Sequence, residues 1–344
     1  MRRRTRALLV ALSTFLVLGS AVVVLCHFET WKNREISLSD SISIDIESGT
    51  SFREIARTLA DSGLIENQLY FEVYARLNNF SERLQAGLYS FSGSVDVNSV
   101  ISRLVTGDVD AFPVMLPEGG TYLEFKSILT NLPHLKNDIE HLEVSTVMDE
   151  LGLTMNSDWV TNGHGEGWFF PAQYEYQAGD AASSILLKAH REMQSRLEEV
   201  WNTRFDSEHI NSRYDLIKLA SIIEKESALA EDQKRISRVF FNRLEKNMRL
   251  QADPTVIYGL GDTFTGNLTR AHLKTDNEYN TYMRRGLPPT PICSPSLNSL
   301  EAAARPAEGD EFYFVSRGDG TSEFSRTLTE HNRAVQKYQK LTRH

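Results

Sequence analysis

The sequence predicts an α+β protein that consists of one N-terminal transmembrane helix, a small β/α subdomain and a larger mixed α/β domain. Three observations support this prediction. The chain opens with an uncharged apolar run, a short strand–turn–helix pattern follows, and longer amphipathic helices then alternate with isolated strand patterns. With 344 residues, of which 41% are hydrophobic, the chain is long enough to form more than one hydrophobic core.

The first residues predict a cytoplasmic tail at 1–6 and a membrane span at 7–26. Four arginines precede Ala7–Cys26, a run of twenty residues without a charge. At about 1.5 Å per helical residue, such a run crosses the roughly 30 Å of a bilayer's hydrocarbon core. The positive-inside bias keeps the arginines in the cytoplasm and places the rest of the chain outside, beginning with a linker at 27–38. A cleaved signal peptide is the alternative, although no small-x-small cleavage pattern precedes His27.

The charge of the exterior part is acidic. The formal net charge is −9, and taking away the four arginines of the tail leaves −13, because no other charged residue occurs before Glu29. A nucleic-acid partner requires a basic stripe that neutralises phosphates, and the sequence contains none. We therefore expect no nucleic acid among the partners.

Residues 39–110 have the pattern of a small β/α module. Three isoleucines alternate with polar residues at 42, 44 and 46, as in a strand, and the turn Ser48–Thr50 can cap a helix. Apolar residues then recur at helical spacing from Phe52 to Leu59. A second helix is expected from Gln68 to Arg76.

The same order of strand, Gly-Thr turn and helix returns between Met115 and Leu129, which predicts an internal duplication. The first copy resembles the LysM module, which binds the glycan of cell walls. A plain structural unit between the membrane and the following domain is the alternative interpretation.

The most informative stretch is Leu216–Ser227, which runs from apolar residues into two carboxylates without a turn residue and so predicts a helix. On that helix Glu226 shares a face with Leu219, Ile222 and Ile223. A carboxyl held against aliphatic side chains loses hydration, which raises its pKa and keeps a proton available near neutral pH, as a general acid requires. A surface Glu-Lys-Glu motif at the end of a buried helix is the alternative.

Other segments carry polar groups among apolar ones. Glu166 lies in Gly165–Tyr174 with four aromatic residues, which is typical of a core plug or of a cleft wall that packs on sugar rings. Gln251, Asp253 and Tyr258 interrupt a later apolar run, as groups that line a cleft would. The remaining elements that we expect are a helix from Ala181 to Arg204, a helix from Arg235 to Leu244, a stiff proline-rich loop from Gly286 to Ile292, a strand from Glu311 to Val315 and a closing helix from Leu328 to Leu341.

Six motifs together resemble the MltG (YceG-like) family of membrane-anchored endolytic murein transglycosylases. They are Ala220–Ser227, Val239–Leu244, Leu250–Gly259, Tyr279–Tyr282, Gly286–Pro289 and Tyr313–Val315. The resemblance covers essentially the whole exterior chain and implies that residues 111–344 form the catalytic domain. It also implies a single-pass inner-membrane protein that carries a LysM-like subdomain.

The resemblance implies a reaction as well. Members cleave the bond from N-acetylmuramic acid to N-acetylglucosamine within nascent glycan strands, leave 1,6-anhydro ends and so limit strand length during cell-wall synthesis. The expected partners are peptidoglycan glycan strands and cell-wall synthases. No metal or cofactor is needed, and the acid is the glutamate of the Glu-Ser pair, here Glu226.

The residues expected to hold the sugar are polar groups from several motifs. They are Gln251, Asp253, Tyr279, Asn280 and Tyr282, with Asn242, Glu166 and Glu224 behind them. Two other hypotheses for the function remain open. The protein could be a muramidase that uses Glu224, Glu166 or Asp253 as a second carboxylate, or a non-catalytic scaffold that binds the cell wall.

Overall fold

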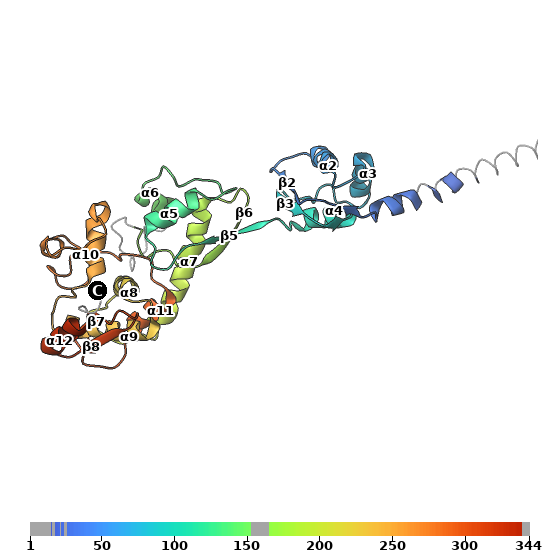
Figure 1. Cartoon of the computed structure of the whole chain (residues 1–344). Helices are drawn as coiled ribbons and strands as arrows, with labels where there is room; N and C mark the ends of the chain where they lie inside the picture. The colour runs from blue at the N-terminus through green and yellow to red at the C-terminus, as the bar shows by residue number, and fades with distance from the viewer. Residues whose placement is uncertain (1–14, 16–17, 21, 24–25, 153–164, 339–344) are drawn as a thin grey trace, which may run out of the picture. The chain divides into compact units, whose positions relative to one another are not determined.

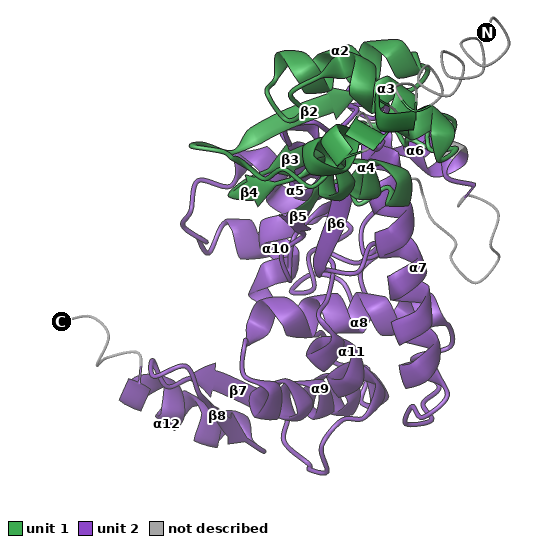
Figure 2. Ribbon diagram, turned by 90° about the vertical axis from the view of Figure 1, so that its right-hand side faces the viewer, with its two compact units in different colours: residues 1–112, 177–179 green, residues 113–176, 180–344 purple. Residues whose placement is uncertain are grey.

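The structure is a computed structural model that describes residues 15, 18–20, 22–23, 26–152 and 165–338 (Figure 1). It contains two compact units, of which unit 1 comprises residues 1–112 and 177–179, and unit 2 comprises residues 113–176 and 180–344 (Figure 2). The predicted span at 7–26 lies largely outside the described residues. No helix within the described part of the chain combines the length and the apolar character that crossing a membrane requires.

Unit 1 packs three helices against two short antiparallel strand pairs. Leu59, Phe71, Tyr89 and Leu104 are fully buried in its core. The elements are β1 (Ile36–Ser37) paired with β4 (Ser94–Val95), β2 (Ile42–Ile46) paired with β3 (Gly87–Phe91), and the helices α2 (Phe52–Asp61), α3 (Gln68–Leu77) and α4 (Val97–Thr106).

The helices α2 and α5 (Tyr122–Thr130) begin in the same way. Ser51 and Thr121 are the N-caps, and each forms a capping box with a glutamate three residues later. The cap of α2 is therefore Ser51 and not a residue of the predicted turn Ser48–Thr50. Each of the two helices follows a strand, in the order expected for the duplication.

The structure differs from the sequence prediction at residues 27–38, which were expected to form a linker. Phe28 and Trp31 pack their rings against Tyr70 and Tyr74 of α3, at centroid distances of 5.5 to 6.4 Å. Trp31 is buried, the other three rings are partly buried against the same core, and β1 pairs with β4, so the segment is part of unit 1.

Unit 2 is mixed α/β, and most of its core comes from helices. Two strand pairs lie at its ends, while α8, α9 and α11 pack against one another through buried apolar faces. Trp168 is fully buried, whereas Phe170 is partly exposed. The elements are β5 (Ala111–Met115) paired with β6 (Gln173–Gln177), α5, α6 (Val144–Glu150), α7 (Ala182–Trp201), α8 (Arg213–Glu226), α9 (Ala230–Glu245), α10 (Asp253–Leu260), α11 (Leu297–Ala304), β7 (Tyr313–Ser316) paired with β8 (Ser322–Ser325), and α12 (Leu328–Tyr338).

The mixed α/β class is confirmed. The helix predicted around Glu226 is α8, and the predicted second helix of the small module is α3. The closing helix begins at Leu328 as expected, and the last residues predicted for it, beyond 338, lie outside the described part of the chain.

Candidate active site

The last residue of α8 is Glu226, and its position follows from the apolar face of that helix. Leu219, Ile222 and Ile223 are completely buried and hold the final turn against the core. The helix stops at Ser227, whose backbone is extended and whose carbonyl oxygen accepts a hydrogen bond from the Gln233 side chain of α9. The carboxyl of Glu226 therefore lies at the C-terminal end of a helix, where the dipole disfavours a negative charge.

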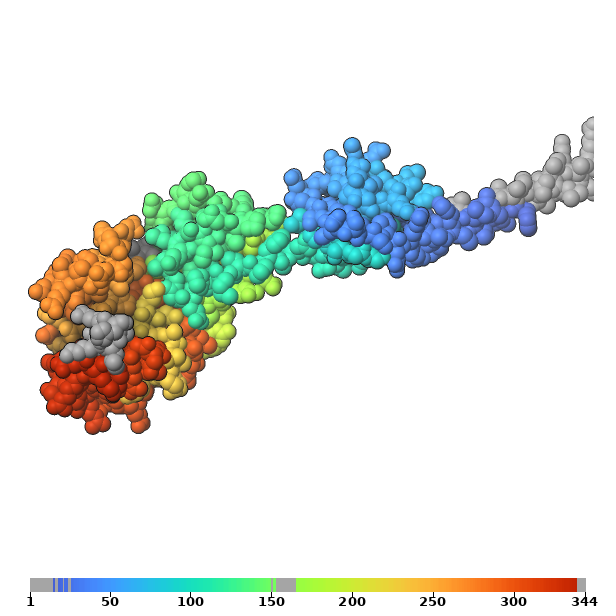
Figure 3. Space-filling model, viewed as in Figure 1, coloured from blue at the N-terminus to red at the C-terminus, as the bar shows by residue number. Residues whose placement is uncertain are grey.

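Glu226 faces a cavity of about 440 Å³ that we call the Glu226 cavity. Its lining includes the N-terminal end of α10 and the strands β7 and β8, which belong to the orange and red regions in Figure 3. Polar side chains that line it with Glu226 are Arg243, Gln251, Asp253, Tyr282, Tyr313, Ser316, Ser322 and His331.

The surroundings of Glu226 favour its protonated form. Burial and, to a smaller extent, the negative charge of Asp253 raise the pKa of this carboxyl to about 8, against the opposing effect of the positive charge of Arg243. Among the described residues none donates a hydrogen bond to the Glu226 carboxyl. The side chain is only partly exposed. It can therefore hold a proton at neutral pH and offer it to a ligand in the cavity.

Asp253 is the first residue of α10, where the helix dipole favours an acidic side chain. Its Oδ1 accepts a hydrogen bond of 2.5 Å from the Tyr282 hydroxyl, which fixes the carboxylate at the rim of the cavity. Gln251 adopts a left-handed backbone conformation with φ of 52°, which is rare for a residue with a side chain. Thr281 holds that conformation, because its carbonyl accepts from Gln251 N and its hydroxyl accepts from Ala252 N.

The sequence motifs contained Arg243 and Tyr313, but their place in the site was not foreseen. Arg243 is 6% exposed, and its guanidinium donates hydrogen bonds to the carbonyls of Leu250 and Phe312. It thus ties α9 both to the loop before α10 and to the residue before β7, and its guanidinium lies over the ring of Tyr313. An arginine beside the apolar packing residues near the end of the predicted helix was the only signal in the sequence.

Glu166 and Tyr279 lie in a second cavity of about 730 Å³, which we call the Glu166 cavity. The Glu166 carboxyl accepts hydrogen bonds from the backbone N–H of Tyr122 (3.1 Å) and the hydroxyl of Tyr258 (3.3 Å). Burial raises its pKa to about 7, and the two hydrogen bonds oppose that rise. The rings of Tyr258 and Tyr279 meet edge to face at 4.9 Å.

Gly167 sets the position of the segment that carries Glu166. Its backbone has φ of 77°, and an added Cβ would lie 2.6 Å from Ile217 of α8 and 2.7 Å from Pro291. Only glycine fits at this close approach, so the segment packs directly between α8 and the proline-rich loop.

Three other predicted site residues bind the protein itself. Asn242 donates to the carbonyls of Gly309 and Glu311, and Asn280 donates to three carbonyls between His272 and Thr275. Both asparagines are buried and position loops. Glu224 accepts from the Ser296 amide at 3.0 Å and from the hydroxyls of Ser296 and Ser299, each at 2.6 Å. It anchors the N-terminus of α11 and does not line either cavity.

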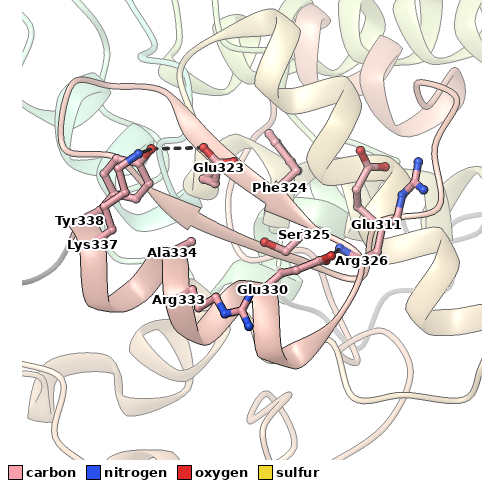
Figure 4. Close-up of a pocket in the computed structure, with 10 residues that line it drawn as sticks. All are labelled: Glu311, Glu323, Phe324, Ser325, Arg326, Glu330, Arg333, Ala334, Lys337 and Tyr338. Carbon is pink, nitrogen blue, oxygen red and sulfur yellow. Dashed lines mark hydrogen bonds between the residues drawn. The ribbon is translucent and has the colours of Figure 1, made fainter.

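A third cavity, of about 540 Å³, lies between β8 and α12 (Figure 4). Two of the carboxylates that line it, Glu323 and Glu330, are held ionised. The guanidinium of Arg317 lowers the pKa of Glu323, and hydrogen bonds from Thr327 lower the pKa of Glu330. Neither group can serve as a proton donor near neutral pH. In the part of the chain that the structure describes, no group of three or more His, Cys, Asp or Glu side chains could hold a metal ion.

Comparisons with known proteins agree with one another. A model of the YceG-like family matches residues 44–337. An endolytic murein transglycosylase of Bacillus subtilis is 31% identical over 309 residues, which cover 87% of this chain and 85% of that protein. One of Streptococcus pneumoniae is 28% identical, and the match covers 86% of this chain and 58% of that protein.

A crystal structure of a YceG-like protein from Listeria monocytogenes matches with a TM-score of 0.55 and 30% identity, and covers 86% of this chain and 99% of that one. The family model and the bacillar relative each cover most of the chain. This protein therefore belongs to the YceG-like family.

Proposed function

We propose that this protein is an endolytic lytic transglycosylase of peptidoglycan in which Glu226 is the general acid and base. The names of the relatives from B. subtilis and S. pneumoniae support the activity. The observation that carries the assignment of the acid is the Glu226 carboxyl itself. It has a pKa of about 8, lines an open cavity, and accepts no hydrogen bond from any described residue.

In the proposed reaction, Glu226 gives its proton to the oxygen that joins N-acetylmuramic acid to N-acetylglucosamine, and the bond from that oxygen to C1 breaks. The Glu226 carboxylate then takes the proton of the muramic C6 hydroxyl while the C6 oxygen bonds to C1. One product carries a 1,6-anhydro end, the other a free N-acetylglucosamine hydroxyl, and no water is consumed. Acid–base help of this kind contributes on the order of 10²–10⁴ in rate.

Asp253 and Tyr282 complete the chemistry in this proposal. Positive charge develops at C1 as the glycosidic bond breaks, and a carboxylate on the same cavity wall stabilises it. The hydrogen bond from Tyr282 holds the Asp253 carboxylate in place before the substrate binds. Gln251 offers an exposed amide to sugar hydroxyls.

The Glu166 cavity supports cleavage within a strand. Lys225 and Glu226 are consecutive residues of α8 but line different cavities, and α10 contributes Asp253 to one and Tyr258 to the other. A strand bound at Glu226 can therefore continue around the end of α8, where Tyr258 and Tyr279 present aromatic surface to a further sugar. An enzyme that binds sugars on both sides of the scissile bond cuts internally.

The location and the domain roles belong to the same proposal. Residues 1–6 are cytoplasmic, 7–26 span the inner membrane, 39–110 form a LysM-like module and 111–344 form the periplasmic catalytic domain. The enzyme limits the length of nascent strands beside cell-wall synthases. A periplasm-specific reporter fused after residue 344 should be active, and a fusion that works only with a cytoplasmic reporter would contradict this topology.

Mass spectrometry of the products tests the activity. Glycan strands incubated with the detergent-solubilised full-length protein should yield internal fragments with 1,6-anhydro ends. Reducing ends would instead show hydrolysis by a muramidase, with Asp253 the carboxylate placed to act as the second one. If the protein binds glycan but leaves the strands uncut, it is a non-catalytic scaffold that binds the cell wall.

A further inference from the structure

Among the described residues of unit 1, the exposed large apolar side chains are confined to two helices. They are Phe15, Leu18, Val22 and Val23 in the N-terminal helix, whose described residues are 15, 18–20, 22–23 and 26–32, and Leu69, Val73 and Leu77 on α3. No other large apolar side chain among the described residues of unit 1 is exposed. If exposed apolar residues were distributed at random, some of them would lie on α2, α4 or the strands. Their restriction to two helices therefore marks a specific apolar surface.

The three residues on α3 form a stripe, which we call the α3 stripe. Their spacing of four residues places Leu69, Val73 and Leu77 on one side of the helix, and they are 65%, 42% and 74% exposed. The exposed ionisable side chain on α3 is Arg76, a cation that pairs with Glu72 at 3.1 Å. The stripe therefore presents apolar surface to water without a repelling negative charge.

The N-terminal helix and α3 are fixed to each other. His27 and Trp31 contact the Tyr70 ring at 5.8 and 5.5 Å, and Phe28 contacts the Tyr74 ring at 5.9 Å. These contacts begin immediately after the predicted span at 7–26. In Figure 1, α3 lies at the end of unit 1 from which the N-terminal helix departs.

We propose that the α3 stripe lies in the outer interface of the lipid bilayer, so that unit 1 rests on the membrane surface. The inference rests on the proposed membrane anchoring of residues 7–26. It follows from continuity, because the helix that would leave the bilayer packs on α3 without an intervening linker. Tyrosine and tryptophan prefer this interface, and apolar side chains on one helical face gain free energy by leaving water there.

Spin labels on the full-length protein can locate the stripe. A Cys26→Ser parent, in which Cys293 stays buried and unreactive, receives single cysteines by Val73→Cys, Leu77→Cys, Phe15→Cys or Asp45→Cys. Asp45 is the matched control, because it is exposed on β2 of the same unit. The labelled proteins are reconstituted in vesicles of phosphatidylethanolamine and phosphatidylglycerol. Frequent collisions of a label with oxygen show that the label lies in lipid, and frequent collisions with a water-soluble nickel chelate show that it lies in water.

The inference predicts that labels at 73 and 77 shift toward oxygen and away from the nickel chelate, as the label at 15 does, while the label at 45 remains aqueous. If the label at residue 15 is in lipid but the labels at residues 73 and 77 are as aqueous as the label at residue 45, the inference is overturned, while the membrane anchoring of residues 7–26 is supported. If 15 is aqueous, the anchoring itself fails, and the inference fails with it. A label at residue 73 could instead be shielded from both reagents and show spin–spin broadening that unlabelled protein relieves. This result would show that the stripe binds a second copy of this chain, and it would overturn the lipid assignment. None of these readings depends on strand cleavage.

Discussion

The Glu226 cavity and the Glu166 cavity of unit 2 each contain a glutamate with a raised pKa, about 8 for Glu226 and about 7 for Glu166, and burial is the main cause in both. Their neighbours differ. Glu166 is 5% exposed and accepts two hydrogen bonds, whereas Glu226 is more exposed, accepts none from the described residues and has Asp253 beside it. A raised pKa shows that a carboxyl retains its proton. Only the free carboxyl can pass that proton to a ligand, which is why we assign the chemistry to Glu226.

The largest expected effect separates these two glutamates directly. Glu226→Gln keeps the shape of the side chain but has no acidic proton, so the rate of anhydro-end formation should fall at least about a hundredfold. Glu166→Gln is the matched control and should lose far less. Both variants must melt like the parent, since replacing a partly buried polar group also changes stability. A greater loss with Glu166→Gln would reverse the assignment.

The second prediction concerns how Glu166 makes the stability of the protein depend on pH. In the folded protein Glu166 has a pKa of about 7 instead of 4.5, so as pH rises from 4.5 to 7 the unfolded chain releases the proton first and the folded state loses stability. The loss should approach about 3 kcal/mol by pH 8. Glu166→Gln, which cannot ionise, should show a smaller decrease of Tm between pH 5 and pH 8. Equal decreases in the variant and the parent would show that Glu166 is ionised at neutral pH.

A third prediction compares the two glutamates of α8. Glu224→Gln weakens the charge-assisted bonds to Ser296 and Ser299, which should lower the free energy of unfolding by about 1.5 kcal/mol. Cleavage should stay much closer to the parent rate than in Glu226→Gln, because Glu224 holds α11 and lines neither cavity. Denaturant unfolding and product formation on the same preparation measure both quantities. Loss of cleavage without loss of stability would give Glu224 a direct role.

The smallest effect distinguishes two tyrosine hydroxyls, each of which donates to an acid in one cavity. Tyr282→Phe removes the donor that fixes Asp253 and should slow cleavage about fivefold, which corresponds to about 1 kcal/mol. Tyr258→Phe removes the donor to Glu166 and should change the rate less. If the order of the two effects is reversed, the Glu166 cavity is the more important one for the reaction.

Local spacing in the sequence was enough to predict α8 and the apolar face behind Glu226, because neighbours on a helix are determined by its period. The same holds for α3 and for the start of α12. Gln251, Asp253 and Tyr282 were all named from the sequence, and the structure brings these three to one cavity. Their grouping depends on Thr281, which joins the loop before α10 to the Tyr279–Tyr282 motif.

Contacts between distant segments could not be predicted. Glu224 is held by serines about seventy residues later, and Arg243 reaches the carbonyl of Phe312. Neither periodicity nor composition contains such pairings. Glu166 and Tyr279 lie in a different cavity from Glu226, and this separation depends on the position of α10. Residues 27–38 pack onto α3 through a cluster of aromatic rings, and their composition, which resembles that of a linker, did not indicate this packing.

The central claim is that burial and the charge of Asp253 together keep Glu226 protonated as the acid. The pH dependence of kcat/KM for anhydro-end formation tests it most directly. For the parent protein we expect kcat/KM to fall as pH rises through about 8, the pKa of Glu226. In Asp253→Asn the fall should occur at lower pH, because the neighbouring negative charge is gone, and in Glu166→Gln it should not move. An alkaline limb that moves with Glu166→Gln and stays in place with Asp253→Asn would contradict the account.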